Sequence, residues 1–164
     1  MRYVLVGSVA ASLYGVDLKP GDLDIVPALD TRNLQSLTSL LLELNARPST
    51  SGHWAVQPDG EKRWVEDESA TELERRTSWV PDPDALSSFD HLFFTKLGNL
   101  DVVPELVGSF ERLNKRAVPM NAHGREIQAA HPDDLLATLT VPRRKKDAAR
   151  VRQLREIQRS RAER

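Results

Sequence analysis

The chain has 164 residues, enough for one hydrophobic core with a small helical appendage and too few for two full domains. It is 40% apolar and 29% charged, and no stretch approaches the roughly 18 to 20 apolar residues of a membrane span, so we expect a folded protein that does not cross a membrane. The absence of cysteine excludes disulfides and thiolate chemistry, and no apolar leader follows Met1, so we expect a cytoplasmic location.

Strands and helices alternate in the first part of the chain. Apolar runs predict strands at Tyr3 to Val6 and at Leu23 to Val26, with Leu23 facing the core. Small residues predict a short helix from Ser8 to Leu13 that Gly15 ends. Asp30 or Thr31 caps the next helix, whose leucines recur at spacings of three and four. Turn signals make residues 48 to 88 a variable hairpin and loop region.

The second part predicts two hairpins followed by two helices. Turn residues join Leu92 to Thr95 with Leu100 to Val103, and "AHG" joins Ala117 to Met120 with Glu126 to Ala129. Helical periodicity then runs from His131 to Thr140 and from Arg143 to Arg159. The order of elements is that of an α/β protein with helices against a sheet.

Gly7 and Ser8 lie where the first strand meets the first helix. A helix that begins there offers unpaired backbone N–H groups and the positive end of its dipole, which is a place for phosphate. Gly7 lets a phosphate approach the backbone, and the Ser8 hydroxyl adds a hydrogen bond. An ordinary helix N-terminus after a strand gives the same pattern, so this motif alone leaves both readings open.

Asp22 and Asp24 are two residues apart on a strand, so their carboxylates point to one face. At about 4 Å their repulsion is roughly 1 kcal/mol in water and roughly 4 kcal/mol at an effective dielectric near 20, which a bound cation would relieve. Such oxygen ligands suit Mg²⁺ or Mn²⁺, with nucleotide phosphates completing the octahedron. Asp101, in the apolar stretch "NLDVVP", would join them from a neighbouring strand. Turn and hairpin aspartates are the alternative interpretation.

The C-terminal residues 143 to 164 carry ten Lys and Arg against three acidic residues, a local charge of +7 that leaves −8 for the rest. A basic helix on an acidic body suggests a polyanion partner such as RNA, although a solvated helix face gives similar runs. Arg152, Arg155 and Arg159 recur at helical spacing away from the apolar stripe, and Arg143 and Arg144 precede that stripe. These five arginines are the candidate RNA contacts.

Gly7-Ser8, the later Asp22-Leu23-Asp24 and the single Asp101 in "LGNLDVV" resemble the nucleotidyltransferase superfamily. The chain is more closely similar to the AbiEii-type nucleotidyltransferases, which include the MenT-like toxins of toxin–antitoxin systems. The similarity extends over "RNLQSLTSLLLELNAR", "TKLGNLDVVPELVGSFERL" and "IQAAHPDDLLATLTVPRRKKDAARVRQL".

The resemblance implies one nucleotidyltransferase domain over residues 1–164, with a mixed sheet flanked by helices in 1–130 and C-terminal helices in 131–164. It implies two Mg²⁺ ions and a nucleoside triphosphate bound between Gly7-Ser8 and the aspartates. Asp22, Asp24 and Asp101 would then bind metal, with Asp101 also activating the acceptor hydroxyl. The toxin-like members transfer a nucleotide to the acceptor end of tRNA, so tRNA and a cognate antitoxin protein become expected partners.

The chain departs from the family at one position. Asp147 matches a further family aspartate, but Leu139 stands where members commonly have a Lys that contacts the triphosphate. Basic residues of the neighbouring loop could supply that charge: Arg143, Arg144, Lys145 or Lys146. Two alternatives therefore stay open, namely a catalytically weak or silent module that binds nucleotide or RNA, and transfer to a protein or small-molecule hydroxyl.

Overall fold

The computed structural model describes residues 1–49, 52–56, 58, 62–66, 79–106, 108–139 and 145–162. Its main body is a mixed sheet in which β2 (Asp22–Pro27) pairs antiparallel with β1 (Tyr3–Val6) and parallel with β7 (Gly98–Val102). In spatial order the seven strands are β3 (Arg47–Pro48), β6 (His91–Thr95), β7 (Gly98–Val102), β2 (Asp22–Pro27), β1 (Tyr3–Val6), β9 (Arg125–Ala129) and β8 (Val118–Ala122).

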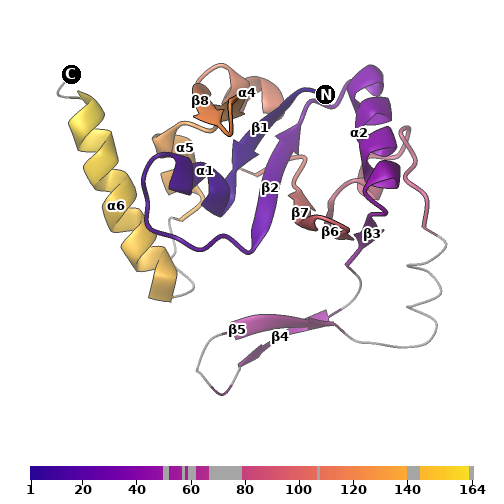
Figure 1. Cartoon of the computed structure of the whole chain (residues 1–164), viewed down its shortest axis with the longest axis horizontal. Helices are drawn as coiled ribbons and strands as arrows, with labels where there is room; N and C mark the ends of the chain where they lie inside the picture. Colours follow the sequence, from indigo (N-terminus) through magenta and orange to yellow (C-terminus); the bar gives the residue numbers. More distant parts are fainter. Residues whose placement is uncertain are drawn as a thin grey trace.

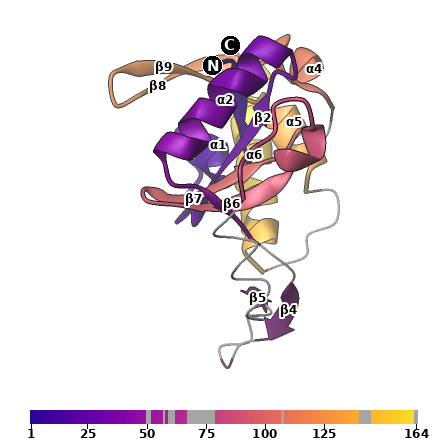
Figure 2. The same cartoon turned by 90° about the vertical axis from the view of Figure 1, so that its right-hand side faces the viewer.

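Helices cover both faces of this sheet (Figures 1 and 2). One face packs against α2 (Thr31–Glu43), and the opposite face carries α1 (Gly7–Leu13), α5 (Pro132–Ala137) and α6 (Lys145–Ala162). Strand β1 lies between these layers, and its Val4, Leu5 and Val6 are at most 2% exposed. A strand buried on both faces reads as a continuous apolar run, as this one does.

Polar contacts fix α2 against the first strand. The Asp30 side chain accepts a hydrogen bond from the Asn33 N–H and so caps the helix. The buried Asn33 amide donates to the carbonyls of Arg2 and Ala28 and accepts from the Arg2 N–H. Leu34, Leu37 and Leu41 of the predicted leucine stripe are buried in the core.

Both predicted hairpins are present. Strands β6 and β7 pair antiparallel, as do β8 and β9, whose two-residue turn has positive φ at His123 and Gly124. Within residues 48 to 88, β4 (Gly52–Val56) and β5 (Lys62–Glu66) form a separate two-stranded sheet. The alternation of strands and helices predicted an α/β fold, and the structure confirms it.

The structure also differs from the sequence prediction. Strand β3, the 3-10 turn η1 (Leu86–Ser88) and helix α4 (Phe110–Asn114) were not predicted. Leu23 was expected in the core but is 40% exposed, because β2 begins at Asp22 and Leu23 lies in a shallow apolar groove beside α2. Thr140, Arg143 and Arg144 lie outside the described residues.

Within the part of the chain that the structure describes, no helix has both the length and the apolar character needed to cross a membrane.

Candidate functional site

Three aspartates meet where β2 and β7 run side by side. Asp24 and Asp101 are direct partners in this parallel pair, and Asp22 is opposite Asn99 two residues earlier. Since side chains alternate along a strand, Asp22, Asp24 and Asp101 share one face, which is the α1 face because the Asp24 carboxylate lies against Gly7. The sequence predicted from spacing that Asp22 and Asp24 share one face, and it predicted that Asp101 joins them if its strand is a neighbour. The parallel pairing of β2 with β7 confirms that the strands are neighbours.

The environment of Asp24 opposes ionisation of its carboxyl group. Burial raises its pKa from 3.8 to about 7, and the nearby charges of Asp22 and Asp101 add to the rise. The backbone N–H of Ser8 and the charge of Arg150 favour the ionised form and limit the shift. Burial and like charges thus raise the pKa of this carboxyl group, and a bound cation would lower it again.

Gly7 lets α1 begin directly against Asp24. Its φ is +64°, which side chains with a Cβ rarely adopt, and a Cβ added there would overlap the Asp24 carboxylate. The Ser8 N–H, expected to face outward for phosphate, instead favours the ionised Asp24 carboxylate. The glycine therefore serves the close approach of backbone to carboxylate, a requirement that the sequence reading assigned to phosphate.

Asp90 is a fourth acidic residue of this cluster, and the sequence did not predict it. Burial raises the pKa of Asp101, and the charges of Asp22 and Asp90 raise it further. Asp90 is exposed and precedes β6, in which Leu92 is the partner of Asp101 across the hairpin. Asp90 thus lies diagonally across from Asp101, a position that only the hairpin register reveals.

The donor set fits Mg²⁺ that is shared with a nucleotide. Within the described ranges, no group of three or more His, Asp or Glu side chains is arranged to hold a metal ion by itself. Mg²⁺ in nucleotide enzymes is usually bound through one or two carboxylates, with phosphates and water as the other ligands. Asp24 and Asp101, adjacent in register, supply such a partial set, and Asp22 is near both.

Helix α6 brings two buried charged residues toward this face. Asp147 and Arg150 are 3% and 7% exposed, while Leu154 one turn further along is fully buried. Arg150, which the sequence reading did not single out, is close enough for its charge to lower the pKa of Asp24. Leu139 is in the hydrophobic core.

The remaining basic candidates divide into exposed and undescribed residues. Arg152, Arg155 and Arg159 are all exposed along α6. Lys145 and Lys146 begin that helix, but their side chains, like all of Arg143 and Arg144, lie outside the described structure. Their spacing of three and four residues places these exposed arginines on one side of α6, which we call its basic surface.

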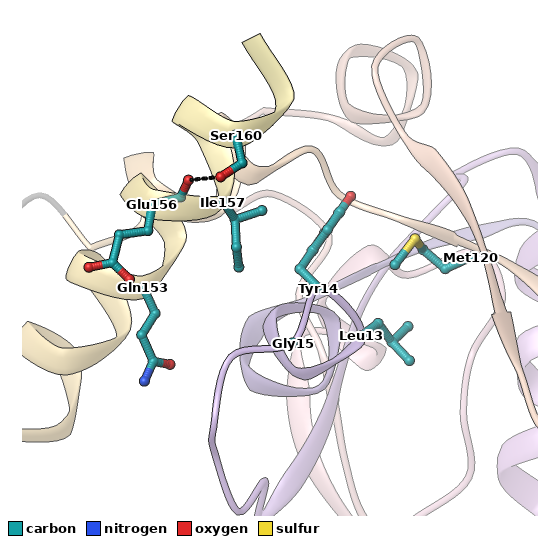
Figure 3. Close-up of a pocket in the computed structure, with 8 residues that line it drawn as sticks. All are labelled: Leu13, Tyr14, Gly15, Met120, Gln153, Glu156, Ile157 and Ser160. Carbon is teal, nitrogen blue, oxygen red and sulfur yellow. Dashed lines mark hydrogen bonds between the residues drawn. The ribbon is translucent and has the colours of Figure 1, made fainter. Parts of the chain in front are cut away.

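An open groove of about 870 Å³ lies between α1 and α6 (Figure 3). Its walls are Leu13 to Gly15 at the end of α1, Met120 on β8, and α6 residues including Gln153 and Ile157. None of the clustered aspartates lines it. The groove therefore belongs to the flank of α6 and is separate from the carboxylate site.

Comparison with known proteins adds little to this description. No protein-family model matches the chain, and no curated protein matches it. It is similar to the solved structure of an antigenic nucleotidyltransferase-like protein from Paracoccidioides brasiliensis, with a TM-score of 0.45 and 15% sequence identity. That similarity covers 95% of this chain but only 66% of the other, less than two thirds of its length. The function is therefore inferred from the site alone.

Proposed function

We propose that this protein is a metal-dependent nucleotidyltransferase that moves a nucleoside monophosphate from a nucleoside triphosphate to an RNA hydroxyl. The observation that carries the proposal is the pairing of Asp24 with Asp101 on neighbouring parallel strands, with Asp22 on the same face. Burial, together with the charges of Asp22 and Asp101, raises the pKa of Asp24 to about 7, and bound Mg²⁺ would relieve the cost of ionising it.

Each carboxylate then has a role in the transfer. Asp22 and Asp24, with Asp101 beside them, would share Mg²⁺ or Mn²⁺ with the triphosphate, and the metal would supply positive charge at the phosphates. The acceptor oxygen bonds to the α-phosphorus while the bond to the pyrophosphate oxygen breaks, and the proton of the acceptor hydroxyl passes to Asp101. Gly7 and Ser8 hold the start of α1 against the Asp24 carboxyl group.

The basic surface of α6 favours RNA as acceptor. Arg152, Arg155 and Arg159 are exposed on the helix whose buried side faces the carboxylate cluster. Their contacts with phosphate would give an affinity that falls with salt, with a slope of about −0.7 per contact for a single strand. Replacing all three with Gln should flatten the slope by about 2 and leave nucleotide affinity unchanged. An unchanged slope would make this surface an ordinary solvated helix face.

The finer assignment follows from the resemblance to AbiEii-type proteins. It places the acceptor at the 3′ end of tRNA and makes the protein the toxin of a toxin–antitoxin pair, with an antitoxin protein as partner. The buried Leu139 favours a second candidate, a nucleotide- or RNA-binding module with weak or no transfer, because no ammonium is present at that position.

Incubation with each labelled nucleoside triphosphate, Mg²⁺ and total RNA tests the proposal. We expect one nucleotide to label RNA in the wild type, with the label lost in Asp24→Asn. Asp84→Asn is the matched control and should keep full activity. Asp84 is exposed, and its charge is not among those that shift the pKa of Asp24 or Asp101. Binding of Mg²⁺ and triphosphate without transfer would select the silent module. Absence of any binding would refute both functions.

A further inference from the structure

Arg150 is buried, unlike the other arginines of α6 whose side chains the structure describes. Arg150 is 7% exposed, whereas Arg152, Arg155 and Arg159 are exposed. Removing a guanidinium from water costs several kcal/mol unless anionic groups and hydrogen bonds compensate it. The position of Arg150 therefore calls for an anionic environment, which an ordinary surface helix does not require.

The packing of α6 directs Arg150 to the carboxylate cluster. Leu154, four residues later on the same helix face, is fully buried in the core. Gln153 accepts a hydrogen bond of 3.0 Å from the Asp17 N–H, which attaches α6 to the loop between α1 and β2. Residues 153 to 160 line the groove beside the C-terminal end of α1, and Arg150 is about 4.5 Å nearer the start of α6 along its axis. Its charge accordingly acts on Asp24.

We propose that Arg150 binds the β- and γ-phosphates of the nucleoside triphosphate and neutralises the pyrophosphate as it leaves. This inference rests on the proposed function. In the state without nucleotide, Arg150 lies near Asp24 and offsets part of the acidic cluster. Metal binding engages the Asp24 carboxylate, and the triphosphate then offers the guanidinium new anionic oxygens in the same place.

Arginine suits this role chemically. Its planar fork matches two phosphate oxygens at once, and its charge persists at every physiological pH. As the acceptor oxygen bonds to the α-phosphorus, the electron pair of the breaking bond passes to the pyrophosphate, where a fixed cation is most useful. Leu139, buried in the core, brings no charge to the site, so Arg150 fills the place of the missing ammonium.

Calorimetry with Mg²⁺ and a non-hydrolysable triphosphate tests the role, with the corresponding monophosphate as second ligand. Loss of a charged hydrogen bond predicts that Arg150→Gln binds the triphosphate about 10- to 100-fold more weakly. The monophosphate lacks the β- and γ-phosphates, so its affinity should change less than threefold. Arg150→Lys keeps the charge without the fork and should fall between. Arg32→Gln, at an exposed position on α2, is the control and should match the wild type.

The outcomes separate this inference from the proposed function. A wild type that binds no triphosphate refutes the proposed function and the role of Arg150 together. If the wild type binds and Arg150→Gln binds equally well, only the role of Arg150 is wrong. A structural role would weaken both ligands by the same factor, which also overturns the inference. If Arg150→Gln does not fold, Arg150→Lys decides by the same ratio of triphosphate to monophosphate affinity.

Discussion

Replacing Asp24 with Asn should stabilise the metal-free protein above pH 7 and have little effect near pH 4. Burial and the charges of Asp22 and Asp101 raise the pKa of Asp24 to about 7 in the folded state, against 3.8 for an ordinary Asp. A raised folded-state pKa means that stability is complete below the unfolded-state pKa and is lost as pH rises from about 4 to about 7. At 1.36 kcal/mol per pH unit the loss is about 4 kcal/mol.

Urea unfolding followed by circular dichroism at pH 4, 6 and 8, without divalent metal, measures this effect. The free energy of unfolding of Asp24→Asn minus that of the wild type should be small at pH 4 and rise toward about 4 kcal/mol at pH 8. Asp84→Asn, at an exposed position, should show no such trend. A difference that stays constant with pH would refute the electrostatic reasoning.

Metal and nucleotide should remove more than half of the stability difference between the wild type and Asp24→Asn. Mg²⁺ with triphosphate stabilises whichever protein binds it, by about 2.7 kcal/mol at a concentration of 100 times Kd. We expect the wild type to gain this amount at pH 8 and Asp24→Asn to gain none. An equal gain in both proteins would show that the ligand binds away from the aspartates.

Two further substitutions test the surroundings of the site. Gly7→Ala should cost more than the roughly 1–2 kcal/mol of a left-handed residue, because its Cβ would overlap the Asp24 carboxylate. Gly124→Ala, with φ +76° and open space, carries the backbone cost alone, and equal thermal destabilisation of the two variants would contradict the overlap. Arg116→Ala should cost about 1–3 kcal/mol in urea unfolding, because the buried Asp134 loses its ion pair at 3.3 Å. We expect the lower end of this range because the Arg116 side chain is 44% exposed. An unchanged free energy of unfolding would mean that solvent screens the pair.

The sequence predicted the elements that local rules determine. The apolar run of β1, the glycine that ends α1 and the leucine stripe of α2 each depend on nearest neighbours or on a 3.6-residue period. The pairing of Asp24 with Asp101 was also within reach, because both aspartates interrupt apolar strands and side chains alternate with period two.

Long-range register decided what the sequence could not predict. Asp90 approaches Asp101 only because β6 and β7 pair with Leu92 opposite Asp101. Leu23 is exposed because it lies near the start of its strand, where α2 and the β6–β7 turn leave a shallow groove. Neither fact follows from the composition of the segments themselves.

The distinction among the α6 arginines was equally hidden. Arg150, Arg152 and Arg155 belong to one charge run in the sequence, and the run as a whole predicted a basic surface. Only the direction in which Leu154 and Gln153 anchor the helix separates a buried Arg150 from its exposed neighbours. Tertiary packing thus gives the arginines of one charge run two different environments.

The acidic cluster is not needed by the fold that carries it. Val26 lies two residues beyond Asp24 on the same face of β2. It is apolar, pairs with Val4 of β1, and both valines are fully buried. The aspartates replace such side chains only at the end of β2 that lies against α1 and Arg150. Asn at position 24 would fill the same volume without the charge, so packing gives no reason for a carboxyl whose ionisation costs about 4 kcal/mol. A cation bound at the site would offset this cost.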